Sequence, residues 1–308
     1  MAADPNILSR RRFLQQGASL GLGALIAPAI GGTAVAASKD RAVIYQGVSL
    51  DSLHPYGYSG GGINGIWLHL IEPLIVMDYT RQKYVGMLAD SWEFQGRRWI
   101  FQLRRNIRFH NGAPLTSKDV AYSIERMKTD KRSLQGGDIQ ELEVETPDDV
   151  TVVFTTKQPL SLLLDRLDTR YIISKAAAEK YGDQADNYAI GTGPYKFVSW
   201  QRGGNLVLAR NDDYWGAKAE IKEVILRGVK EEAARVAGLL SGQADVISNL
   251  PIEEIDRVAK HPRARVEKVP GFRMYFIAMN VNYKPFDNKL VRQAINHALD
   301  PAVMMKHI

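Results

Sequence analysis

Two short glycine-rich matches overlap between residues 57 and 65, and each would serve a different chemistry. The first, Gly57-Tyr-Ser-Gly-Gly61, fits G-x-S-x-G, the turn that presents a serine nucleophile in α/β hydrolases. That turn needs a strand directly before it, whereas Pro55 and a polar loop precede this one. Ser59 is therefore the candidate nucleophile of a secreted hydrolase, and a chance match in a Gly- and Ser-rich loop is the plainer interpretation.

The second match is G-x-G-x-x-G, from Gly60 to Gly65. It lacks the preceding strand of a dinucleotide site and the Lys-Ser/Thr pair of a P-loop. What remains is a run of bare backbone N–H groups, Ser59 to Gly62, beside a helix predicted from Ile63. Such groups suit a carboxylate or peptide carbonyls. The alternative is a flexible turn with no ligand.

The residue types that bind metals and catalyse reactions are sparse or wrongly spaced. The chain has no Cys, which excludes a disulfide framework, thiolate zinc, iron–sulfur ligation and a Cys nucleophile. His69 and Glu72 lie three residues apart and could form a ligand pair, but a lone histidine is more often a partly buried side chain. Paired carboxylates fall in turns and first helical turns, where local structure explains them. We therefore expect no metal, no cofactor and no enzyme activity.

Around these segments the chain has ordinary globular composition, 45% hydrophobic and 24% charged over 308 residues. Helical periodicity and caps predict helices at 63–72, 117–127, 175–181, 231–240, 251–260 and 288–299, with a further start at Asp300-Pro301. Apolar runs and alternation predict strands at 42–46, 98–104, 139–146, 150–156, 195–200, 206–210, 221–226, 245–247, 264–269 and 274–279. The mixture predicts an α/β protein with more than one lobe.

The first residues predict an export signal. Arg10 and Arg11 belong to Ser-Arg-Arg-x-Phe-Leu, which resembles the twin-arginine signal, and no charge follows from Gln15 to Ser38. Ala34-Val-Ala36 is a small-x-small cleavage site, which we favour over a membrane anchor because the apolar stretch is weakly hydrophobic. Cleavage would remove three Arg and one Asp, lowering the net charge from +6 to +4. No basic cluster with interleaved aromatics accompanies that charge, so nucleic acid is not an expected partner.

Eight short motifs in the mature chain then match one family in order: Leu88-Ala-Asp-Ser-Trp-Glu93, Phe101-x-Leu-Arg104, Ile107-Arg-Phe-His-Asn-Gly112, Ser117-x-Asp-Val-x-Tyr-Ser123, Gly191-Thr-Gly-Pro-Tyr195, Asn211-x-x-Tyr-Trp215, Leu240-Ser-Gly-Gln-Ala-Asp245 and Val291-Arg-Gln-Ala294. Together they resemble the periplasmic solute-binding proteins of peptide-type (dipeptide/oligopeptide) ABC importers, extracellular solute-binding family 5. Asn111 departs from the Asp that the family prefers, although Asn serves equally well in a turn.

The resemblance implies a two-lobed periplasmic-binding-protein fold with an additional small α+β domain. It implies a signal peptide at 1–36, a first lobe from 37–79 and 187–279, an inserted small domain at 80–186, and the start of the second lobe at 280–308. The chain ends at Ile308, soon after a fresh helix start, so we expect a truncated chain whose second lobe is mostly missing.

The same resemblance implies capture rather than catalysis. A peptide or peptide-like solute would bind between the lobes and pass to an inner-membrane ABC permease and ATPase, with the protein a periplasmic monomer. The positions that match ligand-facing segments are Tyr58, Ser59, Gly60, Gly61, Gly62 and Ile63, then Phe272, Met274 and Tyr275. The alternatives are the hydrolase with Ser59 and a transporter-independent peptide sensor or chaperone.

Overall fold

The computed structural model describes residues 40–57, 61–79, 81–158, 160, 162–182, 186, 188–268, 276–300 and 303, with no side chains described at 61–64. The chain divides into two compact units, one ending at Glu267 and the other beginning at Lys268. Each unit is described by itself.

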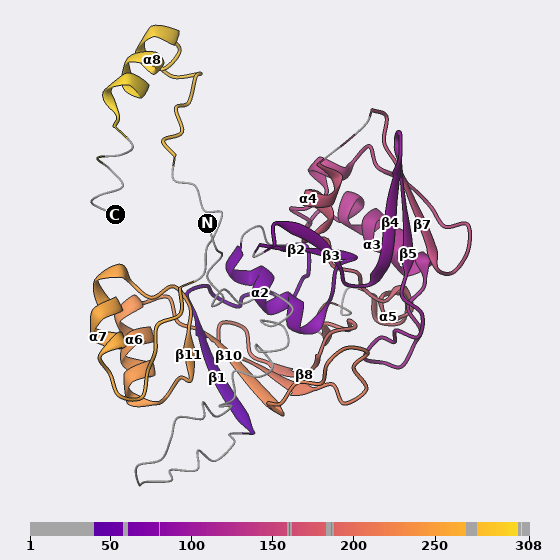
Figure 1. The fold of residues 1–308 in the computed structure, drawn as a ribbon, viewed down its shortest axis with the longest axis horizontal. Coiled ribbons are helices and arrows are strands. Elements are labelled where there is room, and N and C mark those ends of the chain that lie inside the picture. Colours follow the sequence, from indigo (N-terminus) through magenta and orange to yellow (C-terminus); the bar gives the residue numbers. More distant parts are fainter. Residues whose placement is uncertain are drawn as a thin grey trace, which may run out of the picture. The chain divides into compact units, whose positions relative to one another are not determined.

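The larger sheet of the first unit joins strands from distant parts of the chain. It contains β1 (Arg41–Gln46), β8 (Tyr195–Trp200), β9 (Asn205–Arg210), β10 (Glu223–Gly228) and β11 (Val246–Ile247), in the order β11-β1-β10-β9-β8. Strand β1 runs parallel to β10 and β11, whereas β8, β9 and β10 pair antiparallel (Figure 1). Helix α6 (Glu232–Ser241) carries the chain from β10 to β11 and ends at Gly242, whose positive φ suits a glycine C-cap.

A second, wholly antiparallel sheet lies within residues 89–155. It contains β4 (Ala89–Gln95), β5 (Arg98–Leu103), β6 (Glu143–Glu145) and β7 (Thr151–Thr155), in the order β4-β5-β7-β6. Helix α3 (Ser117–Thr129) packs against β6, β7 and α5 (Lys175–Tyr181). Phe101 and Phe154 meet edge to face with ring centroids 5.4 Å apart, and both are fully buried.

Shorter elements complete the first unit. Strands β2 (Ile75–Asp78) and β3 (Lys83–Gly86) form an antiparallel pair, and α4 (Leu163–Leu167) packs beside β2. Helix α7 (Ile255–Ala259) follows a 3₁₀ turn at Ile252–Glu254. A further 3₁₀ turn, Gly137–Ile139, precedes β6.

Helix α2 (Gly61–Leu70) lies against β8 and supplies Ile66, Trp67 and Leu70 to the core. The buried cluster continues from α2 into both larger sheets. The helix ends at Leu70, because Pro73, three residues later, disfavours further helical turns. This helix is the element that would position residues 61–63.

The second unit contains helix α8 (Lys289–Ala298), which begins at the cap predicted from Asn288. The Asn288 side chain accepts a hydrogen bond from the backbone N–H of Leu290, 2.9 Å away. No residue of α8 is buried. None of the helices in the described ranges is both long and apolar enough to cross a membrane.

Most predicted elements are confirmed to within a few residues, and two predicted strands are wrong over their described residues. Residues 264–268 and 276–279 form no strand, although the first segment alternates in polarity and the second is wholly apolar. A strand exists only where a neighbour completes its hydrogen-bond ladder, and no described segment pairs with these residues. The strand predicted at 139–146 is also too long, because the turn at Gly137–Ile139 occupies its start.

Candidate functional site

The first group of predicted ligand-binding residues lies at the start of α2. Gly61, Gly62 and Ile63 are the first three residues of the helix, which begins two residues earlier than the sequence predicts. The first N–H groups of a helix have no partner within it, so they can face a bound acceptor. Tyr58, Ser59 and Gly60 lie outside the described residues.

The second group lies outside the described residues as well, namely Phe272, Met274 and Tyr275. The described residues that follow them, 276–279, are not a strand, so the predicted strand 274–279 is wrong over that part. The twin-arginine pair, Arg10 and Arg11, is likewise outside. The described part of the candidate site is therefore α2 and the segments that fix its two ends.

Before α2, His54 ties the loop to the end of α3. Its Nε2 lies 2.9 Å from Asp130 Oδ2, and its Nδ1 accepts the backbone N–H of Tyr56 at 3.2 Å. Because Nδ1 is an acceptor, the geometry assigns the ring proton to Nε2, which donates to the carboxylate. The Tyr56 hydroxyl also donates to the carbonyl of Tyr171, 2.9 Å away, and burial raises the Tyr56 pKa. The chain just before residue 58 is thus held by Asp130 and Tyr171, which belong to the region of the four-stranded sheet β4-β5-β7-β6.

Asp130 belongs to a larger group of alternating charges. It also accepts from the Arg132 backbone and guanidinium, and these bonds hold its pKa well below the usual value for aspartate. Beside it, Arg126 donates from one nitrogen to both oxygens of Asp186, each 2.8 Å away. His54 Nε2 lies 3.7 Å from Asp186, which links the two pairs. Every charge in this cluster is compensated by a neighbour of opposite sign.

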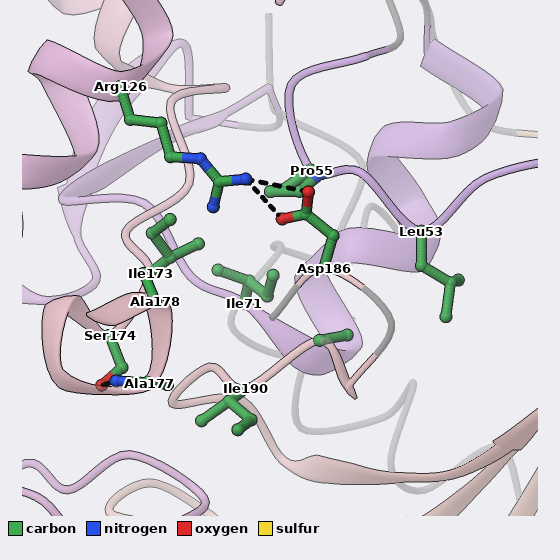
Figure 2. Close-up of a pocket in the computed structure, with 11 residues that line it drawn as sticks. Leu53, Pro55, Ile71, Arg126, Ile173, Ser174, Ala177, Ala178, Asp186 and Ile190 are labelled. Atoms are coloured by element: carbon green, nitrogen blue, oxygen red, sulfur yellow. Dashed lines mark hydrogen bonds and ion pairs between the residues drawn. The ribbon is translucent and has the colours of Figure 1, made fainter. Parts of the chain in front are cut away.

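A pocket opens beside this cluster, and Figure 2 shows Arg126 and Asp186 at its wall, bonded to each other. Its other lining residues are mostly apolar: Leu53, Pro55, Ile71, Ile173, Ala177, Ala178, Ala189 and Ile190, with Ser174. It holds about 280 Å³ of empty space, its solvent-open mouth included. The enclosed part suits a water molecule rather than a peptide. We do not assign it as the solute site.

After α2, the side chain of Glu72 fixes the other end of the helix. Glu72 is fully buried and accepts three hydrogen bonds. Thr192 Oγ1 and Trp215 Nε1 donate to its Oε2 at 2.8 and 2.9 Å, and the Tyr214 hydroxyl donates to Oε1 at 2.6 Å. Burial outweighs these donors and raises the Glu72 pKa to about 7.

Glycines in the loop 191–194 bring its backbone directly onto the end of α2. A Cβ at Gly191 would lie 2.2 Å from the carbonyl oxygen of Leu70, and one at Gly193 would lie 2.5 Å from that of His69. The Gly193 N–H donates to the Leu70 carbonyl at 3.0 Å. No other residue type permits this approach, which satisfies one of the orphan carbonyls at the helix end.

His110 and Arg104, from the segment that follows β5 of the four-stranded sheet, contact the same junction. His110 Nδ1 accepts the Gly191 N–H at 3.3 Å, and its Nε2 lies 3.0 Å from the Gly193 carbonyl. Burial lowers the His110 pKa to about 4, in agreement with a neutral ring. Arg104 lies over the Trp215 ring, 5.6 Å from its centroid, and pairs with Asp90 at 2.8 Å. Residues of five of the eight shared motifs therefore meet at this junction.

The geometry does not favour the enzymatic alternatives. Residues 47–57 contain no strand, so the strand that a nucleophile elbow requires before Ser59 is absent from this described segment. His69 and Glu72 do not form a ligand pair, because His69 Nδ1 lies 2.6 Å from the Gly65 carbonyl and Glu72 is engaged elsewhere. Within the described ranges, no three His, Asp or Glu side chains group as a metal site.

The fold defines the class of the protein. A structure of the periplasmic binding protein DppA from Helicobacter pylori, associated with an ABC transporter and in complex with peptide STSA, superimposes with a TM-score of 0.75 at 27% identity. The match covers 87% of this chain and 58% of that one. The model for bacterial extracellular solute-binding proteins, family 5, matches residues 83–308. The chain belongs to this family, whose members are solute-binding proteins.

Two curated relatives are similar over most of this chain. The glutathione-binding protein GsiB of Pectobacterium atrosepticum is 29% identical over 277 residues, covering 88% of this chain and 54% of its own length. The probable D,D-dipeptide-binding periplasmic protein DdpA of Escherichia coli is 30% identical over 233 residues, covering 72% and 45%. The chain thus spans about half the length of the curated relatives it matches.

Sequence reasoning missed the residues that anchor α2. His54 and Asp130 are 76 residues apart, and no spacing rule connects them. Glu72 is the last residue of the predicted helix 63–72, and the sequence marks it only as a possible metal-ligand partner of His69. Trp215 closes one of the shared motifs, but that motif does not indicate that its indole N–H donates to Glu72.

Proposed function

We propose that this chain is part of a periplasmic protein that captures a peptide or peptide-like solute and delivers it to the permease and ATPase of an ABC importer. The observation that supports it most is the family match over residues 83–308. Relatives named for glutathione and D,D-dipeptides, and a neighbour holding a peptide, agree with a peptide-like solute. The protein is proposed to act as a monomer, without a cofactor.

For the site, we propose that the solute meets residues 58–63, at the start of α2, together with Phe272, Met274 and Tyr275. A peptide offers carboxylate and carbonyl acceptors, which the unpaired N–H groups of a helix start suit. For the domains, we propose a first lobe formed by residues 37–79 and 187–279, an inserted small domain at 80–186, and the start of a second lobe at 280–308.

The test of the function is solute binding by the complete gene product. Native mass spectrometry would identify a co-purified solute, and calorimetry would use glutathione, D-Ala-D-Ala and an L-dipeptide. We expect one of these classes to bind with a Kd of about 1 μM or tighter, about −8 kcal/mol, and to be recovered unchanged. Gly61→Val should weaken that binding at least about tenfold, because a Cβ obstructs approach to the helix start. Absence of binding to all probes, or turnover of one, would contradict the proposal.

For export, we propose the twin-arginine pathway with cleavage after Ala36. The support is the Ser9–Leu14 motif and the uncharged stretch behind it. Replacing Arg10 and Arg11 with Lys keeps the charge but removes the pair that the receptor reads. We expect the precursor to stay in the cytoplasm, measured by cell fractionation. Normal periplasmic accumulation of the double variant would argue for another route.

A further inference from the structure

The contacts of Glu72 go beyond ordinary core packing. A carboxylate with no solvent access is costly unless several donors satisfy it, and here three different side chains do so. Those donors come from two loops, Thr192 from one and Tyr214 with Trp215 from the other. Glu72 lies two residues after Leu70, where α2 ends, so its carboxylate joins this end of the helix to both loops.

We propose that Glu72 is a positioning residue: its side chain holds the end of α2 to the loops 191–194 and 211–215, and through the helix sets the place of residues 61–63. This inference rests on the proposed function in one respect, namely that residues 61–63 meet the solute. A ten-residue helix is about 15 Å long and stiff, so fixing one end limits movement of the other.

Backbone contacts alone would leave the junction dependent on a few hydrogen bonds. The Gly193 N–H bonds to Leu70, and the Ile172 N–H bonds to the Glu72 carbonyl, both at 3.0 Å. Asn211 Nδ2 donates to the Gly193 carbonyl at 3.0 Å, which links the two loops to each other. Glu72 is the side chain that connects α2 to both loops at once, which backbone bonds to a single loop do not achieve.

Titration of Glu72 provides a second measurement, which a residue that only fills space would not affect. Of the ionisable groups that face it, His110 and His69 have lowered pKa values, Tyr214 has a raised pKa, and Arg104 is paired with Asp90. Glu72, whose pKa is raised to about 7, therefore changes charge between pH 5 and 8, whereas His110, whose pKa is lowered to about 4, is already neutral there. Trp215 can only donate, so its indole N–H reports directly on the acceptor.

The experiment uses the complete gene product and three variants. Glu72→Ala removes the acceptor, Glu72→Gln keeps an amide acceptor of the same shape, and Glu220→Gln removes an exposed carboxylate as a control. Hydrogen exchange of α2 amides should rise at least about tenfold in Glu72→Ala and stay within about threefold of wild type in the other two. The Trp215 indole resonance, assigned with Trp215→Phe, should titrate near pH 7 in wild type and stay flat in Glu72→Gln.

Two results would overturn the inference: unchanged exchange of α2 in Glu72→Ala, or equal increases in α2 and α6, which indicate global destabilisation. If Glu72→Ala does not fold, Tyr214→Phe and Thr192→Val each remove one donor and should raise exchange in α2 but not α6. Glutathione binding is measured separately, to test the solute assignment apart from the positioning role. If exchange and titration behave as expected while wild type ignores glutathione, the solute assignment fails and the positioning role stands.

Discussion

Gly191 shows what the shared motifs do at the scale of single residues. Its missing side chain lets the loop backbone touch the end of α2, with 2.2 Å between a built Cβ and the Leu70 carbonyl oxygen. Its neighbour Thr192 then reaches Glu72. The five motifs that meet at this junction thus make scaffold contacts, which explains why they indicate the fold more sharply than the solute.

The first prediction concerns that glycine. Gly191→Ala should lower the free energy of unfolding by about 2–4 kcal/mol, because the loop must move away from α2. The matched control is Gly65→Ala, within α2, where a Cβ meets nothing within 4 Å. That change should stabilise by about 0.5–1 kcal/mol through helix propensity. Urea denaturation measures both, and equal effects of the two substitutions would contradict the prediction.

The second prediction concerns the pH dependence of stability. Burial raises the Glu72 pKa from 4.5 to about 7, so the folded state holds the proton more tightly than the unfolded state. The resulting stability is fully present below pH 4.5 and is lost as pH rises through 7. Relative to Glu72→Gln, wild type should lose about 3 kcal/mol between pH 4.5 and 8. Parallel stability–pH curves for the two proteins would contradict this.

At the scale of elements, Asp119 joins two helices. Its carboxylate accepts the backbone N–H and hydroxyl of Thr116 at the start of α3, both at 2.9 Å. The other oxygen accepts the N–H of Lys175, the first residue of α5, also at 2.9 Å. One buried side chain therefore satisfies the starts of both helices, which is more than the capping role that its sequence position predicts.

The third prediction follows from this double role. Asp119→Ala should destabilise by about 2–3 kcal/mol, since it leaves donors at two helix starts unpaired. Lys118→Ala, next to it but exposed in a surface pair with Asp149, should change stability by less than about 0.5 kcal/mol. Thermal unfolding of both variants measures the difference. A loss below about 1 kcal/mol for Asp119→Ala would show that the link to α5 contributes little.

Elements whose signals are local could be predicted from the sequence, and those defined by distant partners could not. The α3 and α5 caps and the β8 boundaries lie within a few residues of their determinants. Strand β4 was missed because its sequence alternates weakly, with an irregular register between Ala89 and Ser91. The candidate site is harder still, since the donors to Glu72 lie 120, 142 and 143 residues along the chain.

At the scale of the whole first unit, contacts from different parts of the chain hold the loop before α2 and the segment after it. On one side, His54 and Tyr56 tie the preceding loop to Asp130 and Tyr171. On the other side, Glu72 ties the end of the helix to the loops around the larger sheet. The region of the four-stranded sheet β4-β5-β7-β6 thus contacts the chain that leads into the proposed solute-binding segment. This region therefore helps to position that segment.

The last prediction tests the His54 anchor. His54→Ala removes the contact with Asp130 and leaves the Tyr56 N–H unpaired, so we expect a loss of about 2 kcal/mol. The matched control is His261→Ala, because His261 also accepts the N–H two residues later but lies just after α7, with no carboxylate partner among the described residues. Hydrogen exchange should rise across residues 52–57 in His54→Ala alone, while α6 stays protected in both proteins. If residues 52–57 exchange as slowly without the imidazole as with it, the loop is held by Tyr56 and its backbone, and His54 is not an anchor.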